Sequence, residues 1–115
     1  MKDISSALQY KGREYKVVFN LNVMEAIQAE YGSTTAWIEK AEGENGGEPD
    51  AKAVIFGFAQ MLNEGIDIDN DDNGTNHPPM TLKQVGRMLS EVGLANANKL
   101  MQDTIIESSK TGQKN

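Results

Sequence analysis

Part of an Asp-rich segment has the residue types and spacing of a calcium-binding loop. The residues at the first, third, fifth and sixth positions of that pattern are Asp69, Asp71, Asn73 and Gly74. The twelfth position normally supplies a bidentate glutamate, but here it is Met80. Because this ligand is missing, we interpret residues 67–74 as a solvated part of a polar loop near 66–79, and we expect no metal site.

The other reactive residues lack the partners that catalysis requires. His77 is the only histidine, so neither a histidine-rich metal cluster nor a paired histidine base is available. The nearby acidic residues have no evident pocket that would desolvate them and shift their pKa values. The absence of cysteine excludes disulfides, thiolate nucleophiles and cysteine zinc sites. We therefore expect a protein that is not an enzyme and uses no cofactor.

Large apolar residues point instead to binding of another protein. Val54, Ile55, Phe56 and Phe58 nearly encircle one predicted helix. An all-round apolar helix must be buried either by its own fold or by a neighbour. Trp37 either closes the core or anchors a partner, and Met61 either fills the core or contributes to an adaptable groove. We predict Trp37, Phe56 and Met61 as partner-binding residues.

Composition and charge narrow the class of protein further. The 115 residues are enough for one domain, which we assign to 1–115. A net charge of −6 disfavours nucleic acid as a partner, because phosphate binding needs a concentrated basic patch. No segment approaches the roughly 20 apolar residues that cross a bilayer, and residues 1–10 lack the apolar run of a secretion signal. We expect a cytoplasmic protein with no membrane contact.

Apolar periodicity predicts a mostly α (α+β) fold, with an N-terminal β-hairpin packed on a bundle of about four to five helices. The hairpin turn is expected at Lys11-Gly12-Arg13. A capping box that begins at Asn22 predicts a first helix over about 23–31, and Ser33 is expected to cap a short second helix. The segment near 42–49 is rich in Gly and Glu, and we predict a mobile acidic loop there.

Three longer helices complete the prediction. The central helix should cover 51–63 and end at Gly65, after which the polar loop begins. A capping box at Thr81 opens the next helix, and a last helix over about 95–109 precedes a frayed tail at 110–115. The residues predicted to be buried are Phe19, Ile27, Val54, Phe58, Leu89 and Ile105.

Several short phrases occur in a definite order along the chain. They are Tyr15-Lys16-Val17-Val18-Phe19, Asn22-Val23-Met24-Glu25-Ala26-Ile27, Tyr31-Gly32, Leu62-Asn63-Glu64-Gly65, Pro78-Pro79-Met80-Thr81 and Gln84-Val85-Gly86-Arg87-Met88-Leu89. Together with the order of elements, they resemble tail assembly chaperones of siphophages and prophages of Gram-positive bacteria. The resemblance spans most of residues 8–106 and includes no catalytic signature.

This resemblance implies a small, helix-rich, non-enzymatic protein of the bacterial host cytoplasm. Such a chaperone binds and solubilises the tape-measure protein before the tail tube polymerises, and it is absent from the mature virion. The resemblance also implies a longer, frameshifted form of the same protein as a partner. We further expect homo-oligomers, because an apolar binding surface without its client would otherwise face water.

Two alternative functions stay open. Helices near 82–92 and 95–109 have the order of a helix-turn-helix, which is typical of a small DNA-binding regulator. Against this, the bulky Leu89 stands where that motif usually has a small residue, and the second helix begins with only one cation, Lys99. An exposed basic face on residues 83–99 would favour the regulator. The other alternative is a minor structural protein of the virion, which would be found in purified particles.

Overall fold

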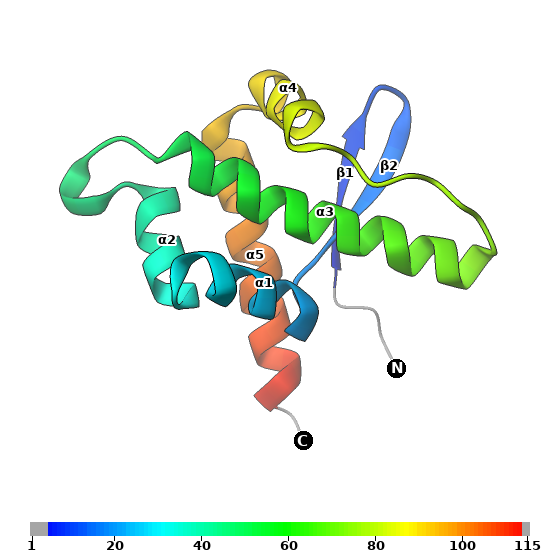
Figure 1. Cartoon of the computed structure of the whole chain (residues 1–115), viewed down its shortest axis with the longest axis horizontal. Helices are drawn as coiled ribbons and strands as arrows, with labels where there is room; N and C mark the ends of the chain where they lie inside the picture. Colours follow the sequence, from blue (N-terminus) through cyan, green and yellow to red (C-terminus); the bar gives the residue numbers. More distant parts are fainter. Residues whose placement is uncertain (1–4, 114–115) are drawn as a thin grey trace.

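The computed structural model describes residues 5–113, which form a two-stranded antiparallel hairpin packed against five α-helices (Figure 1). Strands β1 (Ser5–Tyr10) and β2 (Arg13–Val18) are joined by Lys11 and Gly12. Both turn residues have positive φ, at 50° and 75°, as two-residue turns of the I′ type require. The hairpin and its turn are therefore where the sequence predicts them.

The first two helices begin at capping residues. Helix α1 (Leu21–Tyr31) is capped by Asn20, whose side-chain oxygen accepts a hydrogen bond from the Val23 N–H at 3.2 Å. The predicted cap at Asn22 is wrong, because that residue lies inside the helix and donates to Glu64 at 3.1 Å. Helix α2 (Thr34–Glu42) is capped by Ser33, as predicted.

An irregular acidic segment links α2 to the central helix. It contains one short turn of 3₁₀ helix, η1 (Glu44–Gly46). Its end is fixed by a hydrogen bond of 2.9 Å from the Asp50 N–H to the Lys40 carbonyl. The loop near 42–49 is thus present, although α2 includes its first residue, and its mobility stays a prediction.

Helix α3 (Ala51–Asn73) continues well beyond the predicted end at Gly65. A Cβ at Gly65 would lie 2.2 Å from the Lys16 carbonyl oxygen, so this glycine permits a close approach of α3 to β2. The helix ends at Gly74, which takes a left-handed conformation. The predicted polar loop near 66–79 is therefore wrong over 66–73, where the chain is helical.

The last two helices are separated by Gly93. Helix α4 (Leu82–Val92) opens with the predicted capping box, in which Thr81 and Gln84 exchange hydrogen bonds of 2.8 and 3.1 Å. Helix α5 (Leu94–Gln113) continues through 110–113, so the frayed tail is wrong there. An ion pair of 3.6 Å between Glu107 and Lys110 supports this last stretch. Residues 114–115 lie outside the described residues.

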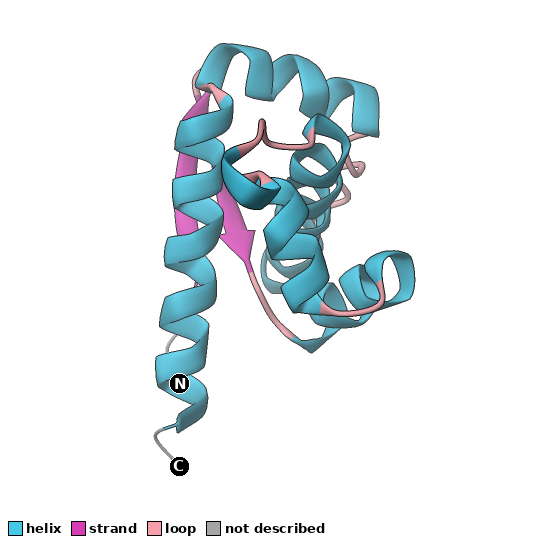
Figure 2. Cartoon of the chain, turned by 90° about the vertical axis from the view of Figure 1, so that its left-hand side faces the viewer, coloured by secondary structure: helices cyan, strands magenta, loops and turns pink. Residues whose placement is uncertain are grey.

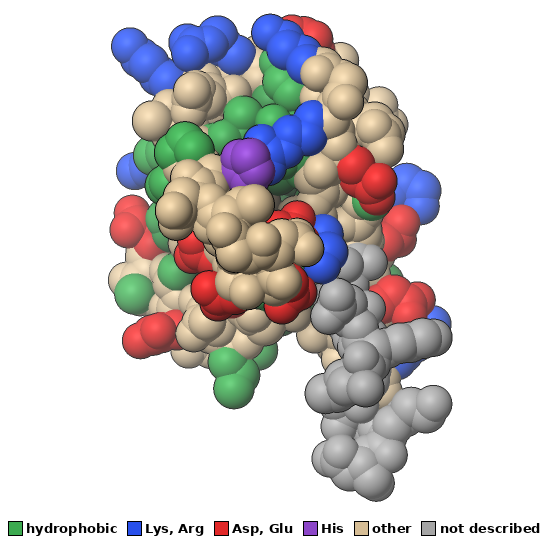
Figure 3. Space-filling view, turned by 90° about the vertical axis from the view of Figure 1, so that its right-hand side faces the viewer, with side chains coloured by type: hydrophobic (Ala, Val, Ile, Leu, Met, Phe, Trp, Pro, Cys, Tyr) green, Lys and Arg blue, Asp and Glu red, His purple; other side chains and the backbone are tan. Residues whose placement is uncertain are grey.

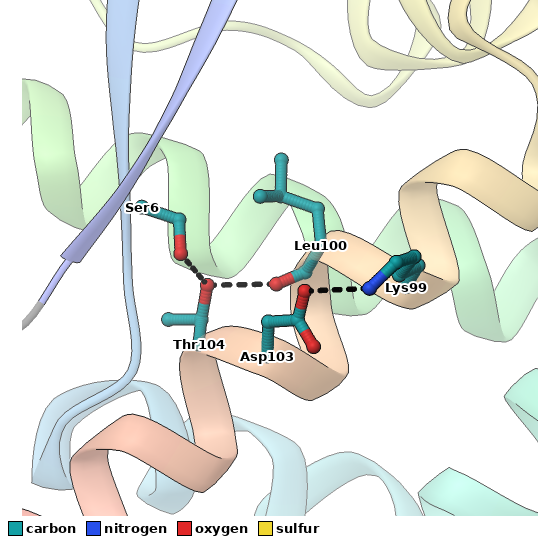
Figure 4. A network of polar contacts seen from close by, with 5 residues as sticks. All are labelled: Ser6, Lys99, Leu100, Asp103 and Thr104. Atoms are coloured by element: carbon teal, nitrogen blue, oxygen red, sulfur yellow. Dashed lines mark hydrogen bonds and ion pairs between the residues drawn. The ribbon is translucent and has the colours of Figure 1, made fainter.

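The core lies between the hairpin and the helices. Helix α3 packs on β2, and α5 runs beside the hairpin along β1 (Figure 2). The buried Thr104 attaches α5 to β1, because its hydroxyl hydrogen-bonds the Leu100 carbonyl and the Ser6 hydroxyl, both at 2.8 Å (Figure 4). Five of the six residues predicted as core are buried; Ile105 is half-buried and packs on the edge of the core. Over residues 5–113, no helix combines the length and apolarity that a membrane span requires.

Candidate functional site

The first half of α3 has more apolar surface than the core covers. Val54 and Phe58 are buried, whereas Ile55 and Phe56 on the adjoining face are only half-buried. The all-round apolar pattern predicts that one face of this helix is left over by the core. Ile55 and Phe56 form such a face. Because exposure of an apolar face to water is unfavourable, this face is a candidate binding surface.

Helix α4 lies beside this face and completes a shallow groove of about 610 Å³. We call it the α3–α4 groove; its apolar floor comprises Ile55, Phe56, Leu82 and Gly86. Helical spacing puts Leu82 on the same side of α4 as the buried Val85 and Leu89, but it is 55% exposed. As the first residue of the helix, it lies beyond the buried stripe that begins at Val85.

Phe56 is held in place by the ring of Tyr31. The two rings meet edge to face, with their centroids 5.6 Å apart and their planes at 68°. The Tyr31 hydroxyl oxygen is buried and has no hydrogen-bond partner in the described part of the chain. Burial raises the pKa of this hydroxyl, and the negative charges of Asp50 and Glu30 raise it further. A fixed ring loses little conformational freedom when a partner binds it.

Three exposed cations line the groove together with its apolar floor. Lys52 belongs to α3, and Lys83 and Arg87 belong to α4. None of the three cationic side chains forms an ion pair or a hydrogen bond with another residue of the described range, although the backbone N–H of Lys52 donates to the Asp50 carboxylate. On the face that carries the end of α3, basic side chains likewise predominate along the upper edge and acidic ones lie lower (Figure 3).

The other two predicted partner-binding residues belong to the core. Trp37 is 2% exposed, and its indole N–H donates to the Ala53 carbonyl at 2.9 Å. Its ring packs so closely on Gly57 that a Cβ there would lie 2.1 Å from it. Met61 is fully buried, at 0% exposure. The sequence leaves open whether Trp37 and Met61 fill the core or contact a partner. Both side chains fill the core, so neither is exposed to a partner.

The Asp-rich segment is built into the fold as the end of a helix. Asp69 forms an ion pair of 3.1 Å with Lys16 of β2. Asn70 accepts hydrogen bonds from the His77 N–H at 3.0 Å and the Thr75 hydroxyl at 2.8 Å. Within residues 5–113, no three His, Asp or Glu side chains gather in a way that could hold a metal ion. These residues therefore attach the chain that returns from α3 to α4.

The first turns of α5, which a helix-turn-helix would use to read DNA, pack on the rest of the fold along one face and are exposed along the other. Near the start of α5, Ala97 is buried and the Asn98 amide donates to the Ala41 carbonyl at 2.9 Å. One turn further, Gln102 hydrogen-bonds Glu42. The first turns of α5 thus face α2. Lys99 is exposed, but it pairs with Asp103 at 3.1 Å (Figure 4), so the basic face expected of a DNA-binding regulator does not continue onto α5.

No protein-family model, curated protein or solved structure matches this chain.

Proposed function

We propose that this chain is a non-enzymatic phage tail assembly chaperone, which binds the tape-measure protein and keeps it soluble until the tail tube polymerises. The observation that supports this proposal is the α3–α4 groove, an open apolar surface on two packed helices of a chain with a net charge of −6. A long helical client with apolar stripes aggregates unless those stripes are covered. The groove offers such a cover.

The mode of binding follows from the shape of the groove. Two neighbouring helices with an apolar floor between them suit an amphipathic helix, which lays its apolar face into the groove. Phe56 and Leu82 are the anchors available to that face. Several copies bound along one client would together cover its apolar stripes, so each copy needs only modest affinity for the client. The net negative charge of the copies keeps the assembly in solution.

The assembly role also defines partners and location. Binding takes place in the host cytoplasm, and the chaperone leaves when tube subunits cover the tape-measure protein, so it is absent from the mature virion. Further copies of this chain and a longer, frameshifted form are additional partners. These features rest on the sequence resemblance, and the groove is compatible with each of them.

Co-expression with the tape-measure protein tests the proposal. The wild-type chain should keep that protein in the soluble fraction and be isolated with it. Phe56→Asp should abolish both effects, because it places a charge on the groove floor. Leu21→Asp is the matched control: Leu21 is an apolar residue of α1, 77% exposed and outside the groove. A tape-measure protein that is equally soluble without this chain, or presence of the chain in purified virions, would contradict the proposal.

A further inference from the structure

We propose that the α3–α4 groove selects amphipathic helices that carry acidic residues on both sides of their apolar stripe. Lys52, Lys83 and Arg87 are the residues that determine this selectivity. The inference rests on the proposed function for its natural client, since it specifies the chemistry of the tape-measure segment that binds. The selectivity itself belongs to the groove and is measurable without that client.

The charge of the groove is opposite to that of the whole chain. The chain has 17 acidic and 11 basic residues, yet the groove is lined by Lys52, Lys83 and Arg87 and by no carboxylate. In other parts of the surface, ion pairs join Lys16, Lys99 and Lys110 to carboxylates. The groove cations have no such partner among the described residues. They are therefore available to carboxylates of a ligand.

The position of two of these cations strengthens the local positive potential. Lys52 and Lys83 are the second residues of α3 and α4, at the positive ends of the two helix dipoles. Neither helix has an acidic residue in its first turn, but the N-cap of α3 is Asp50, whose carboxylate accepts a hydrogen bond from the Lys52 N–H at 3.0 Å, whereas the N-cap of α4 is the uncharged Thr81. A cation at such a place opposes the helix dipole, so it does not stabilise the helix. At α4 the dipole and the cationic side chains together attract anionic groups, whereas at α3 the Asp50 carboxylate offsets the dipole and the Lys52 side chain supplies the positive charge.

The arrangement also predicts where the acidic residues of the ligand lie. Lys52 shares a face of α3 with Ile55 and Phe56, at the spacing of neighbours on a helix surface. Lys83 and Arg87 are spaced in the same way on α4. Cations thus come from both helices around one apolar floor. A helix in the groove meets positive charge on each side of its apolar stripe. The apolar floor between the cations favours a protein helix over a nucleic acid, whose charged backbone has no apolar stripe to cover it.

Two designed helical peptides provide the test. They share one apolar stripe, and one has Glu and the other Lys at the flanking positions. Fluorescence anisotropy with the full chain at low salt should show the Glu peptide binding about tenfold more tightly, as expected for three exposed charge pairs. Added salt should reduce the difference, because it screens exposed charges. Equal affinities, a preference for the Lys peptide, or tighter binding of a DNA duplex would overturn the inference.

Charge-reversed variants assign the effect to the groove. The triple variant Lys52→Glu, Lys83→Glu and Arg87→Glu should reverse the preference, with circular dichroism showing that the fold persists. The control Lys40→Glu, Lys99→Glu and Lys110→Glu changes the net charge equally at exposed positions outside the groove. Because it removes the exposed ion pairs of Lys99 and Lys110, its fold is checked by circular dichroism in the same way. It should keep the preference for the Glu peptide. Loss of that preference in the control would show that net charge, and not the groove, is responsible.

The tape-measure protein then separates the two proposals. Peptide selectivity without binding of that protein would leave the inference standing and remove the proposed function. A tape-measure complex that forms equally well with the charge-reversed triple variant, together with no discrimination between the peptides, would remove the inference and leave the function standing.

Discussion

The two halves of α3 differ in how the fold uses their exposed side chains. In the first half, Ile55 and Phe56 form an apolar surface that no other element fully covers. In the second half, polar side chains bind other parts of the chain: Asn63 to Met80, Asp69 to Lys16 and Asn70 to His77. Polar groups on a projecting helix can thus find partners in neighbouring strands and loops. The apolar face of Ile55 and Phe56 is covered only in part by the chain, with Tyr31 packed edge to face on Phe56, and we propose that a partner covers the rest.

The largest expected effect contrasts two phenylalanines in the first half of α3. Phe58 is 0% exposed, so Phe58→Ala should lower the free energy of unfolding by about 3–5 kcal/mol through the cavity that it leaves. Phe56→Ala removes a half-buried ring and should cost well under half as much. Urea denaturation of both variants measures the difference. Equal losses would mean that Phe56 is a core residue and that the groove has no accessible floor.

The next contrast concerns two glycines on facing elements. Gly65→Ala should destabilise by about 1–3 kcal/mol, because the Cβ would lie 2.2 Å from the Lys16 carbonyl oxygen, which belongs to a paired strand. Gly86→Ala should instead stabilise by about 0.4–1 kcal/mol, since its Cβ would meet only the Ile55 Cδ1 at 3.6 Å. Thermal unfolding distinguishes the two signs. A stable Gly65→Ala variant would show that α3 does not approach β2 so closely.

The third contrast tests the polar half of α3. The Asn63 amide accepts from the Met80 N–H at 2.8 Å and donates to its carbonyl at 3.0 Å. Asn63→Ala should cost about 1–3 kcal/mol, because two partly buried backbone groups lose their partner. Asn73→Ala, at an exposed position, should change stability by no more than about 0.5 kcal/mol. Similar values for both variants would mean that the chain returning to α4 is not held by Asn63.

Local signals in the sequence were sufficient for most of the fold. The hairpin turn and the caps at Ser33 and Thr81 depend on residues close to one another in the chain, and all three are confirmed. The end of α3 depends on a distant contact. Gly65 looks like a helix stop, but its lack of a side chain is needed for contact with β2, so the helix continues past it.

The candidate site likewise depends partly on local sequence patterns and partly on contacts between distant residues. The all-round apolar pattern identifies Phe56 from the sequence alone. By residue type, Trp37 and Met61 are equally good candidates for contact with a partner. Only the packing of α3 on its neighbours shows that both are buried. The groove cations were missed, although Lys83 and Arg87 have the spacing of one helix face. Their nearness to Phe56 arises from the packing of α4 on α3, which no local pattern contains.

The most direct test of the central claim, that the α3–α4 groove is the partner-binding surface, uses the absence of cysteine from the chain. Leu82→Cys and Leu21→Cys each introduce one thiol at an exposed leucine, inside and outside the groove respectively. The rate at which a maleimide modifies each thiol is measured with and without the tape-measure protein. We predict that the partner slows modification strongly in the Leu82→Cys variant and leaves the Leu21→Cys variant unchanged. Unchanged modification in the Leu82→Cys variant within a confirmed complex would contradict the account.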